Sequence, residues 1–233
     1  MMRAQDEKDP RRFRMDALDG TGARSAPWAL LGAQVRRVRV VGIAVPLTTA
    51  ALIALAGSCW ALAAGTASAS LAMLVLMPLY AAAAGLCAAA VFTGDALVEL
   101  HASTPAGFRA VQTMRAAVLL VAAAAGGFAL FAPLHLLGVV YNDAGWASAL
   151  SPAGGAVIMV LVAYAAALAG SGRSATLVVA LVWLFFALIW DPNMAPLALQ
   201  RGVPLLVLLA VGTCAWHALG SPEYAWKKLG GAR

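Results

Sequence analysis

The residues able to do acid–base or coordination chemistry are few, and most of them gather in one segment. Asp95, Glu99, His101 and Arg109 lie within residues 94–115, the most charged segment between two apolar runs. Such a cluster at one face of a membrane could act on lipid-linked phosphates. Its spacing, however, matches no metal-ligand or nucleophile pattern. We therefore keep a membrane-embedded enzyme as an alternative function and name no catalytic residue.

The other metal-binding residue types are scattered along the chain. His135 and His217 lie in separate apolar runs, and Cys59, Cys87 and Cys214 lie in three different ones. None of them has a neighbour at metal-binding or redox spacing. We expect packed histidines and buried cysteines that act as small apolar residues, with no metal and no cofactor. A haem or metal role for His135 is the less favoured alternative.

The chain contains no nucleotide-binding loop of its own. The phosphate-cradling pattern G-x-x-x-x-G-K-S/T is absent, and the three lysines, Lys8, Lys227 and Lys228, follow no such glycine loop. If this protein pumps a substrate, a separate partner chain must hydrolyse ATP. We therefore expect a transport subunit rather than an enzyme.

The composition predicts a membrane protein. Of 233 residues, 63% are hydrophobic and 11% are charged, whereas soluble domains are about half apolar and a quarter charged. A helix needs about 20 apolar residues to cross a bilayer. The length therefore allows six spans with short links and no sizeable soluble domain.

The apolar runs predict an all-α polytopic integral membrane protein with six transmembrane helices. We place the spans at about residues 40–64, 71–92, 116–140, 153–170, 175–190 and 202–219. The remaining segments are a flexible cytoplasmic tail (1–24), an amphipathic interfacial helix (25–39) that precedes the transmembrane domain (40–219), and a C-terminal cytoplasmic tail (220–233).

The interfacial helix is predicted from residue spacing. Trp28, Leu31, Val35 and Val38 recur at helical intervals, while Gln34 and three arginines form a polar side. Such a helix can lie on the inner membrane surface. A plain basic flank to the first span is the alternative.

The distribution of positive charge predicts the topology. With the N-terminus inside, 15 of the 16 Lys and Arg residues face the cytoplasm, and only Arg201 lies outside. The positive-inside rule therefore predicts both termini in the cytoplasm. It also explains the net charge of +6 without a nucleic-acid partner.

Small residues predict close helix packing. The second span contains Ala81–Gly85 and Ala88–Ala90, and the third contains Ala122–Gly127. In lipid, small side chains let helix backbones approach one another. We expect these three segments to lie at helix–helix interfaces.

Residues 94–115 also predict a local structure. Leu100 and Thr104 share one helical face, Pro105 interrupts the helix, and a new helical face starts at Phe108. A helix, a turn and a second helix would form a compact cytoplasmic elbow. An ordinary solvated loop is the alternative.

The segment between the second and third spans carries a recognisable motif. It consists of Asp95, Glu99-Leu100, Ser103-Thr104-Pro105 and a hydrophobic-basic stretch that enters the third span. This motif resembles that of the membrane subunits of ABC exporters of the drug, polysaccharide and haem-export permease type. The six predicted spans and the N-terminal amphipathic helix of this chain are also similar to that family, over residues 25–220.

The resemblance implies how the protein would work. In that family, the elbow contains the coupling helix, which docks on the ATP-hydrolysing subunit. The outer segment between the last two spans is longer in the family than residues 191–202 are here, which leaves the outer gate undefined. The residues implied in ATPase coupling are Glu99, Leu100, Thr104, Pro105 and Arg109.

The function expected from the sequence is therefore the permease subunit of an ABC exporter. Its partners would be an ABC ATPase subunit, a second permease chain in a homo- or heterodimer, and membrane lipid. Scarce charge in the spans indicates a hydrophobic or amphipathic substrate. We expect a multi-pass protein of a bacterial plasma membrane, because arginine far outnumbers lysine and alanine is abundant. An accessory membrane scaffold is a further alternative.

Overall fold

The computed structural model describes residues 21–93, 108–140, 145–169, 172–193 and 196–218, and this part of the chain is helical without any strand. The α-helices are α2 (Thr21–Val38), α3 (Val45–Ala64), α4 (Thr66–Thr93), α6 (Phe108–Leu136), α7 (Leu150–Ala169), α8 (Gly172–Phe185), α9 (Asp191–Asn193) and α10 (Val203–Ala218). Three π-helical segments, η2 (Arg39–Ala44), η4 (Phe186–Trp190) and η5 (Ala198–Gly202), and the 3-10 helix η3 (Gly145–Ala149) join or extend them.

Five continuous helical stretches are long and apolar enough to cross a membrane. They are Leu31–Ala64, Thr66–Thr93, Arg109–Leu136, Gly145–Ala169 and Ser174–Asn193. A sixth apolar stretch, Ala198–Cys214, is shorter. The all-α fold and the multi-pass membrane character predicted from composition are thus supported, with five to six apolar helices in the described part of the chain.

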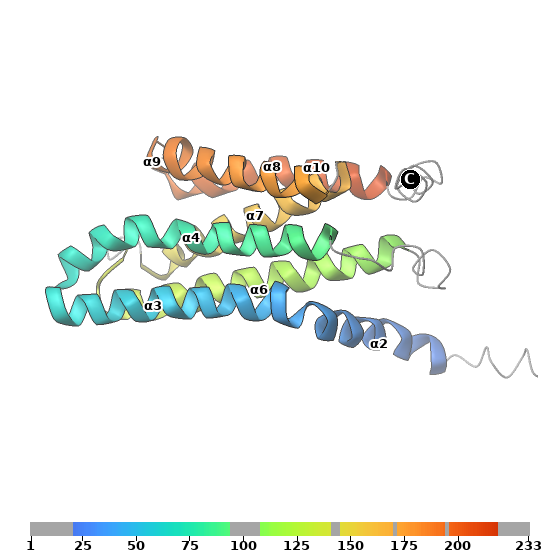
Figure 1. Ribbon diagram of the computed structural model, residues 1–233, viewed down its shortest axis with the longest axis horizontal. Coiled ribbons are helices and arrows are strands. Elements are labelled where there is room, and N and C mark those ends of the chain that lie inside the picture. The colour runs from blue at the N-terminus through green and yellow to red at the C-terminus, as the bar shows by residue number, and fades with distance from the viewer. Residues whose placement is uncertain (1–20, 94–107, 141–144, 170–171, 194–195, 219–233) are drawn as a thin grey trace, which may run out of the picture.

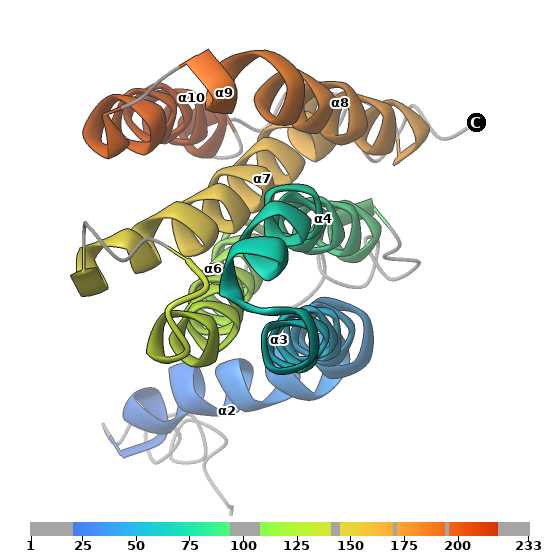
Figure 2. The same ribbon diagram turned by 90° about the vertical axis from the view of Figure 1, so that its left-hand side faces the viewer.

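Helix α7 lies at the centre of the bundle. It packs against α4, α6, α8 and α10, and Figure 2 shows it running diagonally between the layer of α8 and α10 and the group formed by α3, α4 and α6. In the most apolar part of Gly145–Ala169, 67% of residues are buried, against 11% in Ser174–Asn193. Helix α7 is therefore surrounded by protein. The outer helices present apolar side chains outward, as helices in lipid do.

Glycines set the closest helix approaches, as the small-residue segments predicted. A Cβ on Gly127 would lie 2.5 Å from the backbone Cα of Ala153 in α7. A Cβ on Gly85 would lie 2.8 Å from the Cβ of Met159. Neither neighbour can move without its whole helix, so α6 and α4 can pack this closely on α7 only because these positions are glycine.

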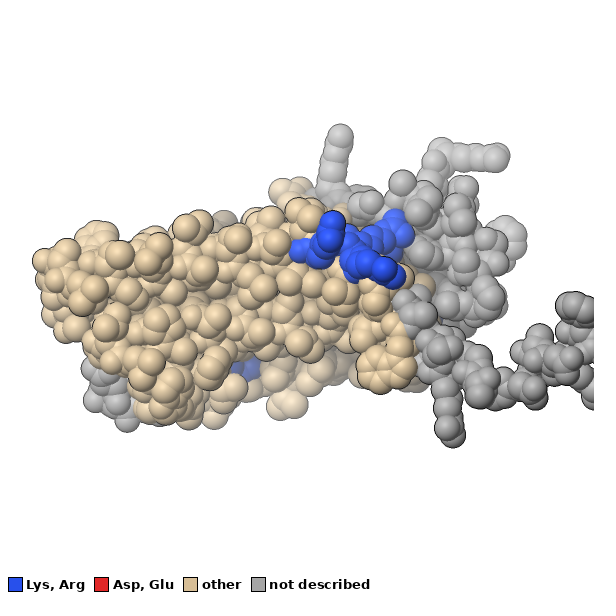
Figure 3. Space-filling view, turned by 90° about the horizontal axis from the view of Figure 1, so that it is seen from below, with Lys and Arg blue, Asp and Glu red and all other residues tan. Residues whose placement is uncertain are grey.

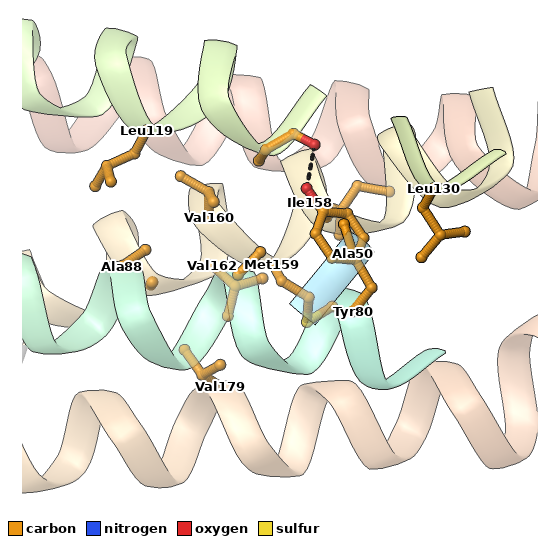
Figure 4. Packing of buried hydrophobic residues seen from close by; sticks show 14 of the residues in the cluster. Ala50, Tyr80, Ala88, Leu119, Leu130, Ile158, Met159, Val160, Val162 and Val179 are labelled. Carbon is orange, nitrogen blue, oxygen red and sulfur yellow. Dashed lines mark hydrogen bonds between the residues drawn. The ribbon is translucent and has the colours of Figure 1, made fainter. Parts of the chain in front are cut away.

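A tyrosine bridges two helices inside this core. Tyr80 is fully buried and its hydroxyl donates a 2.6 Å hydrogen bond to the carbonyl oxygen of Ala123 in α6. Figure 4 shows this bond among the apolar side chains of the core. Gly126 leaves the space that the Tyr80 hydroxyl occupies. The bond satisfies the only polar group that Tyr80 brings into an apolar environment.

The third helix lies earlier in the sequence than expected. The apolar run predicts a span over 116–140, whereas α6 covers Phe108–Leu136. The helix stops because Gly138 adopts a φ of 69°, and Val139 N–H and Gly138 N–H bond back to the carbonyls of Leu134 and His135. This Schellman arrangement ends the helix although the sequence stays apolar.

The N-terminal helix joins the first long helix without a break in helical structure. Helix α2 is followed by the π-helical segment η2 and then by α3. Figure 2 shows α2 crossing beneath α6 at a large angle to α3. The helix predicted over residues 25–39 is therefore present, and its position on a membrane surface stays a prediction.

Candidate functional site

The predicted coupling elbow falls largely outside the described residues. Glu99, Leu100, Thr104 and Pro105 lie in the segment 94–107, of which the structure gives no description. The helix predicted to follow the turn is present, because α6 begins at Phe108. The coupling roles of these residues stay predictions.

Arg109 is the one predicted coupling residue that the structure describes. Its guanidinium carbon lies 3.2 Å from the centroid of the Trp216 ring. Trp216 belongs to the last turn of α10, so this cation–π contact joins the start of the third long helix to the end of the last. Arg109 thus connects two helices beside the undescribed segment.

A buried polar pair fixes α2 on α6. Arg115 is 1% exposed and Gln34 is 4% exposed, and the Arg115 Nε donates a 2.8 Å hydrogen bond to Gln34 Oε1. The residue spacing predicts Gln34 on the polar side of an amphipathic helix together with Arg36, Arg37 and Arg39, whereas the structure buries it against α6. A buried arginine needs hydrogen-bond acceptors, and Gln34 supplies one.

Three arginines at the end of α2 and the start of η2 remain outside the bundle. Arg36, Arg37 and Arg39 are exposed. Figure 3 shows basic side chains gathered near one end of this face, while most of the rest of it is uncharged. We call this the arginine-rich end; it also contains the end of α4 and the start of α6 (Figure 1).

A cavity lies toward the opposite end, between α4, α7, α8 and η5. The cavity has a volume of about 860 Å³, within the range of small-molecule sites. Its apolar wall comes from α4, α7, α8 and η4 and includes Met73, Met77, Met159, Trp183 and Phe186.

An ion pair lines the polar end of this cavity. Arg201 donates to both carboxylate oxygens of Asp191, at 2.6 and 2.8 Å, and its Nε donates to the Ser151 carbonyl oxygen at 3.1 Å. The two side chains are only 14% and 24% exposed. Asp191 is also the only acidic residue within the described ranges. A paired charge at this depth in an apolar protein is expensive, which marks the position as a candidate site.

Further hydrogen bonds hold the cavity wall in place. Trp190 Nε1 donates to the Gln200 carbonyl oxygen at 2.9 Å, and Gln200 Nε2 donates to the Asp191 carbonyl oxygen at 3.2 Å. Deeper in the wall, Trp183 Nε1 donates to the carbonyl oxygen of Pro78 at 2.8 Å. The segment between α8 and α10 is therefore held by bonds within itself, and α8 is tied to α4.

The histidine singled out in the sequence packs as an aromatic residue. His135 stacks on Phe131 with ring centroids 4.8 Å apart, meets Trp146 edge-on at 5.1 Å, and its Nδ1 lies 3.2 Å from the Val140 carbonyl oxygen. In the described part of the chain, no group of three or more His, Cys, Asp or Glu is placed to hold a metal ion.

The expected burial of the cysteines is wrong for two of them. Cys59 and Cys214 are exposed and Cys87 is half-buried. Cys59 belongs to α3 and Cys214 to α10.

Sequence reasoning missed both polar pairs. Arg115 stood in a predicted link, and it is the eighth residue of α6 in the structure. Arg201 was noted only as the exception to the positive-inside count. A signal was present for the second pair: Asp191 and Arg201 are the only charged residues between positions 174 and 222.

Comparison with known proteins identifies no relative: no protein-family model, no curated protein and no solved structure matches this chain.

Proposed function

We propose that this chain is the membrane subunit of an ATP-driven exporter of the ABC type, located in a bacterial plasma membrane. One observation supports this function most: a cavity of about 860 Å³ lies within a bundle of apolar helices. It lies toward the end opposite the exposed arginines of α2. A cavity inside a membrane bundle suits a protein that moves a molecule across the bilayer.

The proposed orientation follows from the arginines. Exposed cations favour the cytoplasmic side of a membrane, so the arginine-rich end faces the cytoplasm and the cavity lies in the outer half. With six spans and both termini in the cytoplasm, successive links between spans lie on alternate sides of the membrane. The pore would form between two such chains, identical or related.

Coupling to ATP would act through the arginine-rich end. Residues 94–107 connect Thr93 of α4 to Phe108 of α6, so a partner docked there would push on the start of α6. The Gln34–Arg115 bond would pass this movement to α2, and the Arg109–Trp216 contact would pass it to α10. ATP binding by the partner would favour one of two states of the bundle by binding it more tightly.

The first experiment measures association with the ATPase subunit encoded nearest to this chain's gene. We expect Glu99→Arg and Pro105→Gly to weaken co-purification about tenfold and to lower stimulated ATP hydrolysis, because one reverses a contact charge and the other softens the turn. The matched control is Asn193→Arg, which adds the same cation to an exposed position at the opposite end. Unchanged association and turnover in both elbow variants would remove the elbow from the mechanism.

The second experiment tests the orientation. Single cysteines at Ala102 and Ala144, introduced after replacement of the three native cysteines, are labelled in intact cells with a membrane-impermeant maleimide. We expect labelling at position 144 only. Labelling at position 102 from outside would overturn the orientation and the docking with it.

A further inference from the structure

We infer that the cavity between α4, α7, α8 and η5 binds a single-chain zwitterionic amphiphile, with its headgroup at the Asp191–Arg201 pair and its chain along α4. This inference names a ligand class for the proposed exporter, but it does not depend on ATP coupling. Binding is a property of the isolated chain and can be measured without an ATPase.

The first argument is the separation of polar and apolar walls. The polar lining lies near helix ends: Ser70 is close to the start of α4, Ser151 is the second residue of α7, and the Asp191–Arg201 pair closes the same end. Inward from there the lining of α4 continues through Met73 and Met77. A ligand that fills this space must be polar at one end and apolar along the rest.

The second argument is the length of the apolar part. The cavity is lined along α4 from Ser70 to Ala81, a distance of about 16 Å at the α-helical rise per residue. Methionines line it from both sides, Met73 and Met77 from α4 and Met159 from α7. Flexible thioether side chains adapt to a chain of variable shape, so an alkyl chain fits this wall better than a rigid ring system.

The third argument is the charge at the polar end. Asp191 and Arg201 neutralise each other, so the mouth has no net charge to select an anion or a cation. Three of the five Arg201 N–H groups are used by Asp191 and Ser151, which leaves two donors, and the carboxylate retains free lone pairs. A headgroup that offers both an anionic oxygen and an ammonium group can satisfy both partners, as phosphoethanolamine does.

The test uses the purified full chain in uncharged maltoside micelles, without an ATPase. The probe is lysophosphatidylethanolamine with a photoreactive diazirine in its chain, and labelled peptides are mapped by mass spectrometry. We expect labelling to concentrate on Met73–Ala81 and on α7 around Met159, and to be displaced by unlabelled lysophosphatidylethanolamine more readily than by lysophosphatidylglycerol of the same chain length.

Two matched variants test the location. Ala81→Trp places a large ring in the cavity wall, whereas Ala90→Trp adds the same ring to an exposed position of the same helix. We expect labelling of the cavity peptides to fall about tenfold in the first variant only. Ala187→Trp, which fills the cavity from the segment after α8, provides the same test if Ala81→Trp does not fold. Equal labelling in the filled and control variants would overturn the inference.

The headgroup is tested separately. Asp191→Asn leaves the mouth with a net positive charge, so we expect preference to change from the zwitterionic to the anionic amphiphile. Arg201→Gln leaves it negative, so lysophosphatidylglycerol should compete even less than in the wild type. An equal loss of both amphiphiles in both variants would show that the pair is only structural and would overturn the headgroup assignment.

The outcome separates this inference from the proposed function. Binding of the amphiphile without ATPase association would contradict the proposed function alone. ATPase association without binding of the amphiphile would contradict this inference alone.

Discussion

The inner group of helices, α3, α4, α6 and α7, and the outer layer of α8, η5 and α10 are held by different forces. In the inner group, a Cβ on Gly127 would collide with the backbone of Ala153. In the outer layer, a Cβ on Gly202 or Gly212 would meet nothing within 4 Å. Close backbone contact therefore holds the inner group, and it is missing at these glycines of the outer layer.

Polar contacts add to the apolar packing by which the outer layer meets α4 and α7, where Val179 of α8 is fully buried. Trp183 reaches the Pro78 carbonyl oxygen of α4, and Arg201 reaches the Ser151 carbonyl oxygen of α7. Between apolar helices in lipid there is little hydrophobic force, so association depends on packing and hydrogen bonds. The cavity lies at this boundary, with its walls formed by α4 and α7 on one side and by α8, η4 and η5 on the other.

The largest expected effect breaks the inner packing. Gly127→Ala must push α6 away from α7, and we expect it to lower the free energy of unfolding by about 3 kcal/mol. The matched variant Gly212→Ala meets open space within a helix, so we expect a gain of up to about 1 kcal/mol from the better helix propensity of alanine. Unfolding in mixed micelles measures both. Equal effects of the two substitutions would contradict the difference between the two regions.

A smaller effect is expected from the ion pair. Asp191→Asn or Arg201→Gln alone leaves a partly buried charge without its partner, and we expect each to lower the free energy of unfolding by about 2 kcal/mol. The double variant removes both charges and should be less destabilised than the sum of the two. A double-mutant cycle measures this coupling, and additive single effects would show that the pair does not stabilise the outer layer.

The smallest effect is expected from one hydrogen bond. Trp183→Phe removes the donor to the Pro78 carbonyl oxygen while keeping an aromatic ring, and we expect a loss of about 1 kcal/mol. The control is Trp60→Phe, which removes a bond from Trp60 Nε1 to Ser68 Oγ on an exposed surface, where water or lipid headgroups replace the partner. A larger loss at Trp60 than at Trp183 would show that Trp183 does not help to attach the outer layer.

Apolar helices and small-residue interfaces could be predicted from the sequence, because both depend on local composition. The positions of Gly85 and Gly127 at helix contacts followed from the runs of small residues alone. The candidate site could not be predicted in this way. The elbow residues, from Glu99 to Pro105, were selected by local pattern, whereas the cavity depends on how segments far apart in the chain meet.

The amino-acid sequence is enough to specify apolar helices in this chain, because hydropathy and length are properties of each segment taken alone. Which polar groups are buried depends instead on how the helices pack against one another. Gln34 can be buried because it accepts a hydrogen bond from Arg115, which lies 81 residues away in the chain. Asp191 and Arg201 became the end of a cavity because α7 and α4 supply its other walls. The cost of burying a polar group depends on its partners, and only the folded arrangement selects them.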